Sequence, residues 1–411
     1  MNKIIKDQIN KLKPSATLAI NEKSNELKKK GKKICKFGFG QSPFPVPGSV
    51  IDALKKNADK HSYLPMQGLE ELRSAIANHL NDHNGNSFEK DNIVIGPGTK
   101  ELMFLTQIAF KGEILLPSPS WVSYQPQALV AQNKVHWIES SRDTNWFPNA
   151  DVLEKKIKSI KNKNLLFFIN SPNNPSGLVC KNFGEIAKVA KKYNLIILSD
   201  EIYSRLTFDK KYKSISNFYP EGTIVSSGLS KWCGAGGWRL GFFAIPKQLN
   251  ELKNSLKILC SESFTSVSAP VQYAAVEAYR GDHSTYLNGV NKILSFTANY
   301  VYENLKSNLI NISKPEGGFY LFPEFTNAKF LSSSEMCKDI LDKTGVALLP
   351  GSDFGLDTAR MIARLSYTDF DGAEFLSNTL GRKKLDKADL EKYAPNIVYG
   401  VSKLKDWSNS L

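Results

Sequence analysis

The chain contains the stretch SKWCGAGGWRLG at residues 230–241, in which one lysine lies among small residues and an arginine follows closely. A desolvated lysine amine loses its proton readily and can form a Schiff base with an aldehyde. Glycines let the backbone approach a ligand closely, and the planar fork of Arg239 suits a phosphate group. Lys231 and Arg239 therefore favour a phosphate-bearing aldehyde as ligand, which points to pyridoxal phosphate.

The composition limits the classes of protein to which the chain can belong. The chain has 411 residues, of which 41% are hydrophobic and 23% are charged, as expected for a folded protein with room for two domains. We find no apolar run of membrane-spanning length and no secretory signal, and we expect a cytoplasmic protein that does not enter a membrane. The five cysteines are scattered without a CxxC pair, so we expect reduced thiols.

The net charge of +14 raises the question of nucleic-acid binding. The basic residues are spread along the chain in short runs, so we expect solvated faces that help to attract anionic ligands, and no nucleic-acid partner. His79 and His83 have the spacing of two metal ligands on a helix, but Leu80 stands where an HExxH motif has its glutamate. We therefore expect no metal site.

Apolar segments alternate with amphipathic helical segments up to about residue 245. The predicted strands are residues 92–95, 113–116, 134–138, 165–169, 195–199, 223–226 and 240–244. Helical periodicity is clearest at residues 69–80, 100–110 and 183–193. Several strands are apolar throughout, as in a parallel sheet that is covered on both faces. The alternation predicts an α/β fold.

The C-terminal part has a different pattern. A long helical segment at residues 284–309 precedes short predicted strands at 318–322, 346–349 and 361–366. This pattern predicts a second, smaller α+β domain that the N-terminal segment joins. We expect an N-terminal arm and part of the small domain at 1–47, a large cofactor-binding domain at 48–283, and the C-terminal small domain at 284–411. The tail from Lys383 onward predicts only a short helix.

Two motifs follow predicted strands at the edge where open α/β sheets bind ligands. GPGTK at residues 96–100 opens a helix, whose free amides and Thr99 hydroxyl could hold a phosphate. Glu101 replaces the third glycine of a dinucleotide-binding motif, and a plain strand-to-helix turn is the alternative. In SPSW at residues 118–121, Trp121 could stack on a heteroaromatic ring or belong to the core.

Two further motifs follow apolar strands. NSPNNPSG at residues 170–177 offers amides for a ring oxygen, or forms a turn of ordinary turn residues. In SDEIY at residues 199–203, a carboxylate closes a buried strand, where it is costly without a partner. A pyridinium nitrogen is such a partner for Asp200.

These motifs, in this order, resemble those of the class I aminotransferases, which are pyridoxal-phosphate enzymes of fold type I. Within that family the chain looks closest to the bacterial aspartate aminotransferase subgroup. The resemblance covers roughly residues 10–380 and includes KPSAT at 13–17, Tyr63 with Gly68, GGFY at 317–320 and RLSY at 364–367. It implies a mostly parallel sheet sandwiched by helices, plus a smaller α+β domain.

The resemblance implies roles around the cofactor ring. Lys231 would hold pyridoxal phosphate as a Schiff base and act as the general base of the reaction. Asp200 would keep the ring nitrogen protonated, which makes the ring an electron sink. Tyr203 and Asn174 would bond the phenolic oxygen, and Trp121 would stack on the ring.

The resemblance also implies a phosphate site and a dimer. Gly98, Thr99, Ser230 and Arg239 match the positions that bind the cofactor phosphate. Tyr63 matches the residue that reaches the phosphate of the neighbouring subunit, which implies a homodimer with shared sites.

Substrate recognition is implied at five residues. Arg364 resembles the arginine that grips the α-carboxylate in a bidentate pair, assisted by the amide of Gly40. Trp121 and Asn174 also border the substrate. Lys100, beside the phosphate loop, matches a lysine that binds a distal carboxylate, although an exposed first-turn lysine is the alternative. We therefore expect ping-pong transfer between aspartate or glutamate and oxaloacetate or 2-oxoglutarate.

The chain departs from the family at two places. Gly228 stands where many relatives have a phosphate-binding serine, which Ser227 or Ser230 would replace. Residues 41–43, Gln-Ser-Pro, replace a more usual acidic pattern beside Gly40. Aromatic, kynurenine, alanine or prephenate transamination and β-lyase chemistry stay open, because fold does not fix function. A regulator that only senses the cofactor is disfavoured, since too few residues precede Gly38 for a DNA-binding domain.

Overall fold

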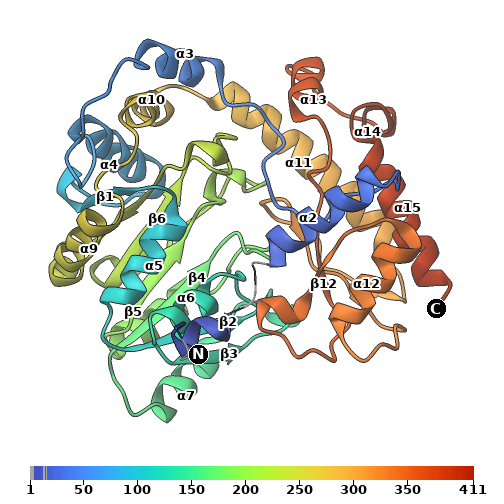
Figure 1. Cartoon of the computed structure of the whole chain (residues 1–411), viewed down its shortest axis with the longest axis horizontal. Helices are drawn as coiled ribbons and strands as arrows, with labels where there is room; N and C mark the ends of the chain where they lie inside the picture. Colours follow the sequence, from blue (N-terminus) through green and yellow to red (C-terminus); the bar gives the residue numbers. More distant parts are fainter. Residues whose placement is uncertain (1–3, 13, 15) are drawn as a thin grey trace.

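The computed structural model describes residues 4–12, 14 and 16–411. Figure 1 shows a large sheet wrapped by helices and, beside it, a smaller group of helices and short strands near the C-terminus. The long helix α11 (Ser284–Leu305) runs from the first part to the second (Figure 1). Of the predicted KPSAT motif, Lys13 and Ser15 lie outside the described residues.

The described residues form a seven-stranded main sheet in the order β1-β7-β6-β5-β4-β2-β3. Its strands are β1 (Ile93–Gly96), β2 (Glu113–Ser118), β3 (Val135–Glu139), β4 (Leu165–Asn170), β5 (Ile196–Asp200), β6 (Thr223–Gly228) and β7 (Gly241–Ala244). All are parallel except β7, which pairs antiparallel with both of its neighbours. The seven predicted strands and the mostly parallel sheet are confirmed, with ends that move by one or two residues.

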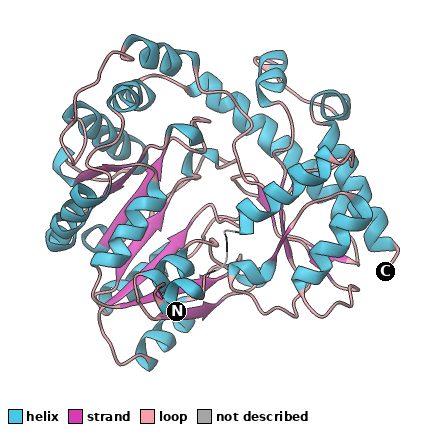
Figure 2. Cartoon of the chain, viewed as in Figure 1, coloured by secondary structure: helices cyan, strands magenta, loops and turns pink. Residues whose placement is uncertain are grey.

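The side chains of the central strands point alternately to the two faces of the sheet, which explains why helices cover both faces. Phe167 packs in a cluster with side chains of α7 and α8, whereas the next residue, Phe168, packs in a cluster with side chains of α5 and α9. Successive strand residues point to opposite faces, so an uninterrupted apolar strand requires cover on both. Figure 2 shows this arrangement of magenta strands between cyan helices.

Of the helices before α11, α2 (Ala16–Lys29) packs on the C-terminal part, where Leu27 clusters with Leu341 (Figure 1). The others lie on the side of the main sheet: α1 (Asp7–Asn10), α3 (Gly48–Lys56), α4 (Glu70–Asn84), α5 (Thr99–Ala109), α6 (Tyr124–Val130), α7 (Ala150–Ser159), α8 (Phe183–Lys192), α9 (Asn250–Ser263) and α10 (Ala269–Arg280). The helices predicted from periodicity correspond to α4, α5, α8 and α11.

The C-terminal part contains a three-stranded antiparallel sheet in the order β11-β12-β9 and a β8–β10 pair. The elements are β8 (Ile310–Asn311), β9 (Tyr320–Leu321), β10 (Glu324–Phe325), α12 (Ser333–Thr344), β11 (Leu349–Pro350), β12 (Ala363–Ser366) and α13 (Gly372–Thr379). The three predicted strands are present but shorter. Cys35 forms a bridge with Val346, so the N-terminal segment contacts this part.

The C-terminal tail differs from the prediction of one short helix. It forms α14 (Lys387–Tyr393) and α15 (Pro395–Asn409). Leu404 and Trp407 of α15 are buried, and the Trp407 indole N–H donates to Asp339 at 2.8 Å. The buried residues Val401, Leu404 and Trp407 of α15 are separated by polar residues that include Lys403 and Lys405, and these hid the buried face of the helix.

The cysteines and histidines also bear on redox state and metal binding. The five cysteines are buried free thiols. Within the described residues, no group of three or more histidine, cysteine or acidic side chains could hold a metal ion; the side chain of His83 lies outside them. No helix among the described residues is long and apolar enough to cross a membrane.

Candidate active site

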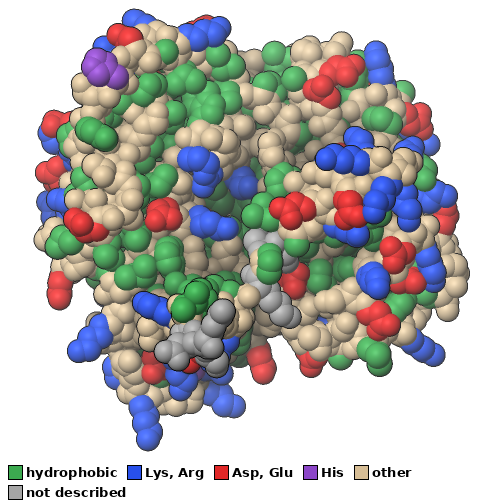
Figure 3. Space-filling view, in the orientation of Figure 1, with side chains coloured by type: hydrophobic (Ala, Val, Ile, Leu, Met, Phe, Trp, Pro, Cys, Tyr) green, Lys and Arg blue, Asp and Glu red, His purple; other side chains and the backbone are tan. Residues whose placement is uncertain are grey.

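A cavity of about 460 Å³ lies at the carboxyl ends of the central strands. Among the residues that line it are eleven of the predicted site residues: Gly40, Thr99, Lys100, Trp121, Asn174, Asp200, Tyr203, Ser230, Lys231, Arg239 and Arg364. Figure 3 shows a hollow between the two parts of the molecule with basic side chains in it. The fold therefore brings together residues that are far apart in the sequence.

Lys231 follows β6 and projects its amine into this cavity. The Nζ atom donates a hydrogen bond to the Gly40 carbonyl at 2.9 Å. Burial, reinforced by repulsion from Arg364, lowers the pKa of Lys231 to about 8. At neutral pH a useful fraction of the amine is therefore uncharged and nucleophilic.

Asp200 is the last residue of β5 and is only 5% exposed. Its carboxylate accepts a hydrogen bond from the Tyr124 hydroxyl at 2.8 Å. Burial raises the pKa of Asp200 to about 6 despite this bond. A buried carboxylate without a cationic partner in direct contact is well suited to a cationic ring nitrogen.

A network of hydrogen bonds orders the side of the cavity near Tyr203. The hydroxyls of Tyr203 and Tyr320 lie 3.0 Å apart. Asn170 accepts from the backbone N–H of Asn174 at 2.6 Å and thereby holds the NSPNN turn. The Asn174 side-chain oxygen accepts from Arg364 Nη1 at 2.9 Å. These contacts fix the donors that would surround a ring oxygen.

Arg364 is carried by β12 and is almost fully buried. Its Nη2 donates to the Gly38 carbonyl at 2.7 Å, and its guanidinium lies 4.6 Å from the centre of the Tyr320 ring. The Nε atom is buried and has no hydrogen-bond partner among the described residues. Burial lowers the pKa of this guanidinium, yet arginine stays charged at neutral pH. A carboxylate in the cavity would compensate this charge.

The GPGTK turn and Arg239 form one cradle. Gly98 has a φ of 88°, and a Cβ at this position would collide with the Arg239 guanidinium. Thr99 begins α5, so the free amides of that helix terminus lie beside the same cation. Arg239 itself donates to the Gly236 carbonyl at 2.9 Å. A helix N-terminus, a hydroxyl and a guanidinium together make an anion site.

The structure explains why position 228 is a glycine and which nearby serine lies in the cavity. A Cβ there would lie 2.7 Å from the Leu240 carbonyl oxygen of the adjacent chain segment, so a side chain does not fit. Ser230 lines the cavity. Ser227 borders a different cavity and donates to the Glu201 carbonyl at 3.4 Å. Of the two predicted replacements, Ser230 is therefore the one that the cavity contains.

Lys100 lies at the cavity wall, with its Nζ 5.2 Å from the centre of the Trp121 ring. Burial and repulsion from Arg239 lower the pKa of Lys100. Lys100 is thus an exposed residue of the first turn of α5 that also lines the cavity, so its role toward a distal carboxylate stays a prediction. Trp121 in turn packs edge-on against Tyr124, with ring centres 5.3 Å apart.

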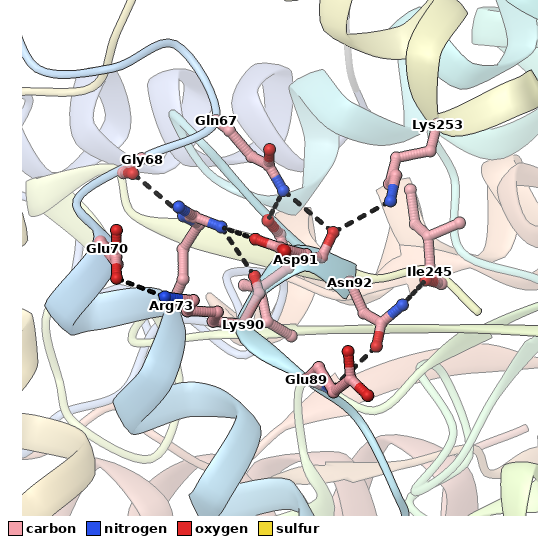
Figure 4. A network of polar contacts seen from close by, with 11 residues as sticks. Gln67, Gly68, Glu70, Arg73, Glu89, Lys90, Asp91, Asn92, Ile245 and Lys253 are labelled. Atoms are coloured by element: carbon pink, nitrogen blue, oxygen red, sulfur yellow. Dashed lines mark hydrogen bonds and ion pairs between the residues drawn. The ribbon is translucent and has the colours of Figure 1, made fainter. Parts of the chain in front are cut away.

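Tyr63 is 88% exposed and does not line the cavity of its own chain. The loop after it is fixed to the sheet, as Figure 4 shows. Arg73 donates to the Gly68 carbonyl at 3.1 Å, and Gln67 donates to the Ile93 carbonyl at 2.8 Å. An exposed tyrosine on an ordered loop is available to a second subunit.

Sequence reasoning missed two hydroxyls of the site. Tyr124 holds Asp200, and Tyr320 contacts both Tyr203 and Arg364. Tyr320 also explains Gly40, because a Cβ at Gly40 would collide with the Tyr320 hydroxyl. Tyr320 belongs to the quoted GGFY motif, whereas no signal in the sequence distinguished Tyr124 from a core residue.

Comparison with known proteins identifies the family. The chain matches the family described as aminotransferase class I and II over residues 32–374. It is 31% identical to an aspartate aminotransferase of Bacillus sp. (strain YM-2) over 383 residues, which span 89% of this chain and 95% of that protein. It is 34% identical to a probable aspartate aminotransferase of Methanocaldococcus jannaschii over 341 residues, or 80% and 88% of the two chains.

A solved structure gives the same result. The aspartate aminotransferase from Thermus thermophilus with maleate superposes with a TM-score of 0.84 at 25% identity, covering 98% of this chain and 99% of that one. The chain therefore belongs to the class I and II aminotransferases. The predicted family and α/β fold are confirmed.

Proposed function

We propose that this transaminase binds pyridoxal phosphate in the 460 Å³ cavity and holds it covalently through Lys231. Three observations support the fit: the lowered pKa of Lys231, the buried carboxylate of Asp200, and the anion cradle of Gly98, Thr99 and Arg239. When bound, pyridoxal phosphate supplies an electron sink for the carbanion that forms at the substrate α-carbon. The convergence of Lys231, Asp200 and Arg239 on one cavity carries the proposal, because it places an amine, a carboxylate and a guanidinium where one ligand can contact all three.

In this proposal each residue around the cofactor has its own role. Asp200 holds a proton on the ring nitrogen by charge pairing. Tyr203 and Asn174 would present hydrogen-bonding groups to the ring oxygen, and Trp121 would pack against the ring. With its amine free, Lys231 Nζ would act as the general base that takes the proton from the substrate α-carbon and then gives it up as a general acid.

The substrate assignment rests on two cations that line the cavity beyond the cofactor groups, the buried Arg364 and the more exposed Lys100. Arg364 would pair with the α-carboxylate and Lys100 with a distal carboxylate, which favours aspartate and glutamate with their oxo acids. Support comes from the similar Thermus thermophilus protein, whose structure holds maleate, a dicarboxylate. Aspartate is also the substrate in the names of the similar Bacillus and Methanocaldococcus proteins.

We also propose a homodimer in which Tyr63 completes the partner's phosphate site. The exposure of Tyr63 and the rigid loop that carries it support this assignment. In the same proposal residues 48–283 form the large domain, and residues 1–47 and 284–411 form the arm and small domain.

The test is amino transfer from L-aspartate to 2-oxoglutarate by purified enzyme. We expect Lys231→Ala to lose more than about 10³-fold in turnover, because it removes both the anchor and the base. We expect Lys100→Gln to lower kcat/KM for aspartate by about tenfold or more, with little change for alanine. Unchanged aspartate kinetics in Lys100→Gln would reject the dicarboxylate assignment, and near-normal turnover in Lys231→Ala would reject the mechanism.

A further inference from the structure

A second cavity, of about 660 Å³, lies outside the site described above. Its walls come from α4, the loop after β5, the segment after Lys231, α10 and the start of α11. It shares none of the lining residues of the active-site cavity. Its volume falls in the range of small-molecule sites.

Arg205 is the central feature of this cavity. Its guanidinium stacks on Trp232, with 3.9 Å between Cζ and the ring centre. The stack occupies the face of the guanidinium and leaves its edge, which carries the N–H donors, unused. Nη1 is buried, and the Arg205 side chain makes no hydrogen bond or ion pair with any residue that the structure describes.

Among the described residues, no acidic side chain forms an ion pair with this cation. Burial lowers the pKa of Arg205 to about 10, and the groups that oppose this effect are Tyr279 and Cys233, both neutral. Glu201 lines the same cavity; its Oε1 accepts hydrogen bonds from Ser199 and Ser214, its buried Oε2 has no partner among the described residues, and burial raises the pKa of this carboxyl to about 7. Asp82 and Asp282 also line the cavity, but both are exposed residues, where solvent screens their charge. A buried unpaired charge is costly, so an external anion is the natural partner.

Asn291 provides a second unsatisfied group on the same wall. Its side-chain nitrogen donates to the Arg205 backbone carbonyl at 3.0 Å, which fixes the amide next to Arg205. Its Oδ1 is buried and lacks a donor within the described residues. A ligand that satisfies both groups needs a carboxylate and, close to it, a hydroxyl or amino hydrogen.

We propose that this cavity binds a small carboxylate that carries a hydroxyl or amino group, with the carboxylate on Arg205 and the substituent toward Asn291. The site is separate from amino transfer and does not depend on the substrate assignment. Arg205 follows Tyr203 closely in the chain and Trp232 directly follows Lys231, so a ligand here contacts the segments that position two active-site residues.

The test compares L-malate with succinate by calorimetric titration of the cofactor-loaded enzyme. The two differ by one hydroxyl, and neither can donate or accept an amino group. Binding at the active site changes the cofactor absorbance, whereas binding at the Arg205 cavity is expected to leave it unchanged. Wild-type enzyme should bind L-malate at a site that leaves the cofactor absorbance unchanged, called the silent site below. The affinity of this site for succinate should be several-fold lower than for L-malate.

Arg205→Gln should abolish the silent site, and Arg205→Lys should weaken it about tenfold, because lysine keeps the charge but loses the planar fork. Lys188→Gln, an exposed position on α8, removes the same charge elsewhere and should change nothing. Asn291→Ala should remove the preference for L-malate and leave succinate binding intact, which keeps the test decisive if Arg205→Gln fails to fold. A wild-type enzyme without a silent site, or a silent site that survives in Arg205→Gln, would overturn the proposal.

Discussion

At the scale of single residues, the active site depends on groups whose pKa values are shifted from their ordinary values by burial. Lys231 and Asp200 lie in one cavity, and burial acts on them in opposite directions. It lowers the pKa of the lysine and raises the pKa of the carboxyl. Both shifts favour the uncharged forms, so burial of these two charges is costly, and the proposed cofactor, with its phosphate and ring nitrogen, would relieve that cost.

Asp200→Asn tests this cost directly. The pKa of Asp200 rises from 3.8 to about 6 in the folded protein, so the folded state binds this proton more tightly than the unfolded state. The contribution of Asp200 to stability is therefore lost as pH rises from about 4 through about 6. In cofactor-free protein we expect the Asp200→Asn substitution to raise the free energy of unfolding by on the order of 2–3 kcal/mol near pH 7.5. Near pH 4 we expect little change, because Asp200 is then protonated in the folded state.

Urea unfolding at both pH values provides the measurement. The exposed Asp52 offers a control, because Asp52→Asn should leave the difference between the two pH values nearly unchanged. An equal effect of Asp200→Asn at both pH values would contradict the role of burial.

The pH dependence of cofactor attachment tests Lys231. With a pKa of about 8, the neutral amine increases up to that pH and then levels off. We expect the rate of covalent attachment of pyridoxal phosphate to cofactor-free protein, followed by absorbance, to show the same profile. Arg364→Gln removes a repelling charge and should move the profile to higher pH. A rate that keeps rising toward about pH 10, as for an ordinary lysine, would be inconsistent with the site.

At the scale of elements, the loop between Tyr63 and α4 is the segment on which the proposed dimer site depends. Gly68 has a φ of 106°, and a Cβ there would collide with Ile95 of β1. We expect Gly68→Ala to cost about 2–4 kcal/mol of stability, from backbone strain and overpacking together. Gly48→Ala at the start of α3 meets nothing within 4 Å and should be nearly neutral. Thermal unfolding compares them, and equal midpoints would refute this reading of the loop.

The elements also show what the sequence could predict. The strands of the main sheet and the helices α4, α5, α8 and α11 were predictable because each buries a continuous face with a clear period. The site residues were predictable as motifs at strand ends. Tyr124 was not, because its hydroxyl contact with Asp200 arises from the packing of α6 on the sheet. The cavity at Arg205 was hidden for the same reason, since its walls come from five separate segments.

At the scale of the whole molecule, the C-terminal helix α15 contributes to the core of the smaller part. Trp407 is 3% exposed and packs edge-on against Phe325 at 5.4 Å between ring centres. Trp407→Ala should cost about 3–5 kcal/mol, by loss of buried area and creation of a cavity. Lys405→Ala, exposed on the same helix, should cost little. If denaturant unfolding gave the two variants equal stability, α15 would not be part of the folded core.

The most direct test of the whole account is to reduce the cofactor-loaded enzyme with borohydride and to locate the modified lysine by peptide mass mapping. Reduction traps pyridoxal phosphate on whichever amine holds it. We predict a single modified residue, Lys231, and loss of the modification when L-aspartate is added before the reductant, because amino transfer frees the lysine. Modification of another lysine, or trapping at Lys231 that L-aspartate and other amino acids leave unchanged, would contradict the account.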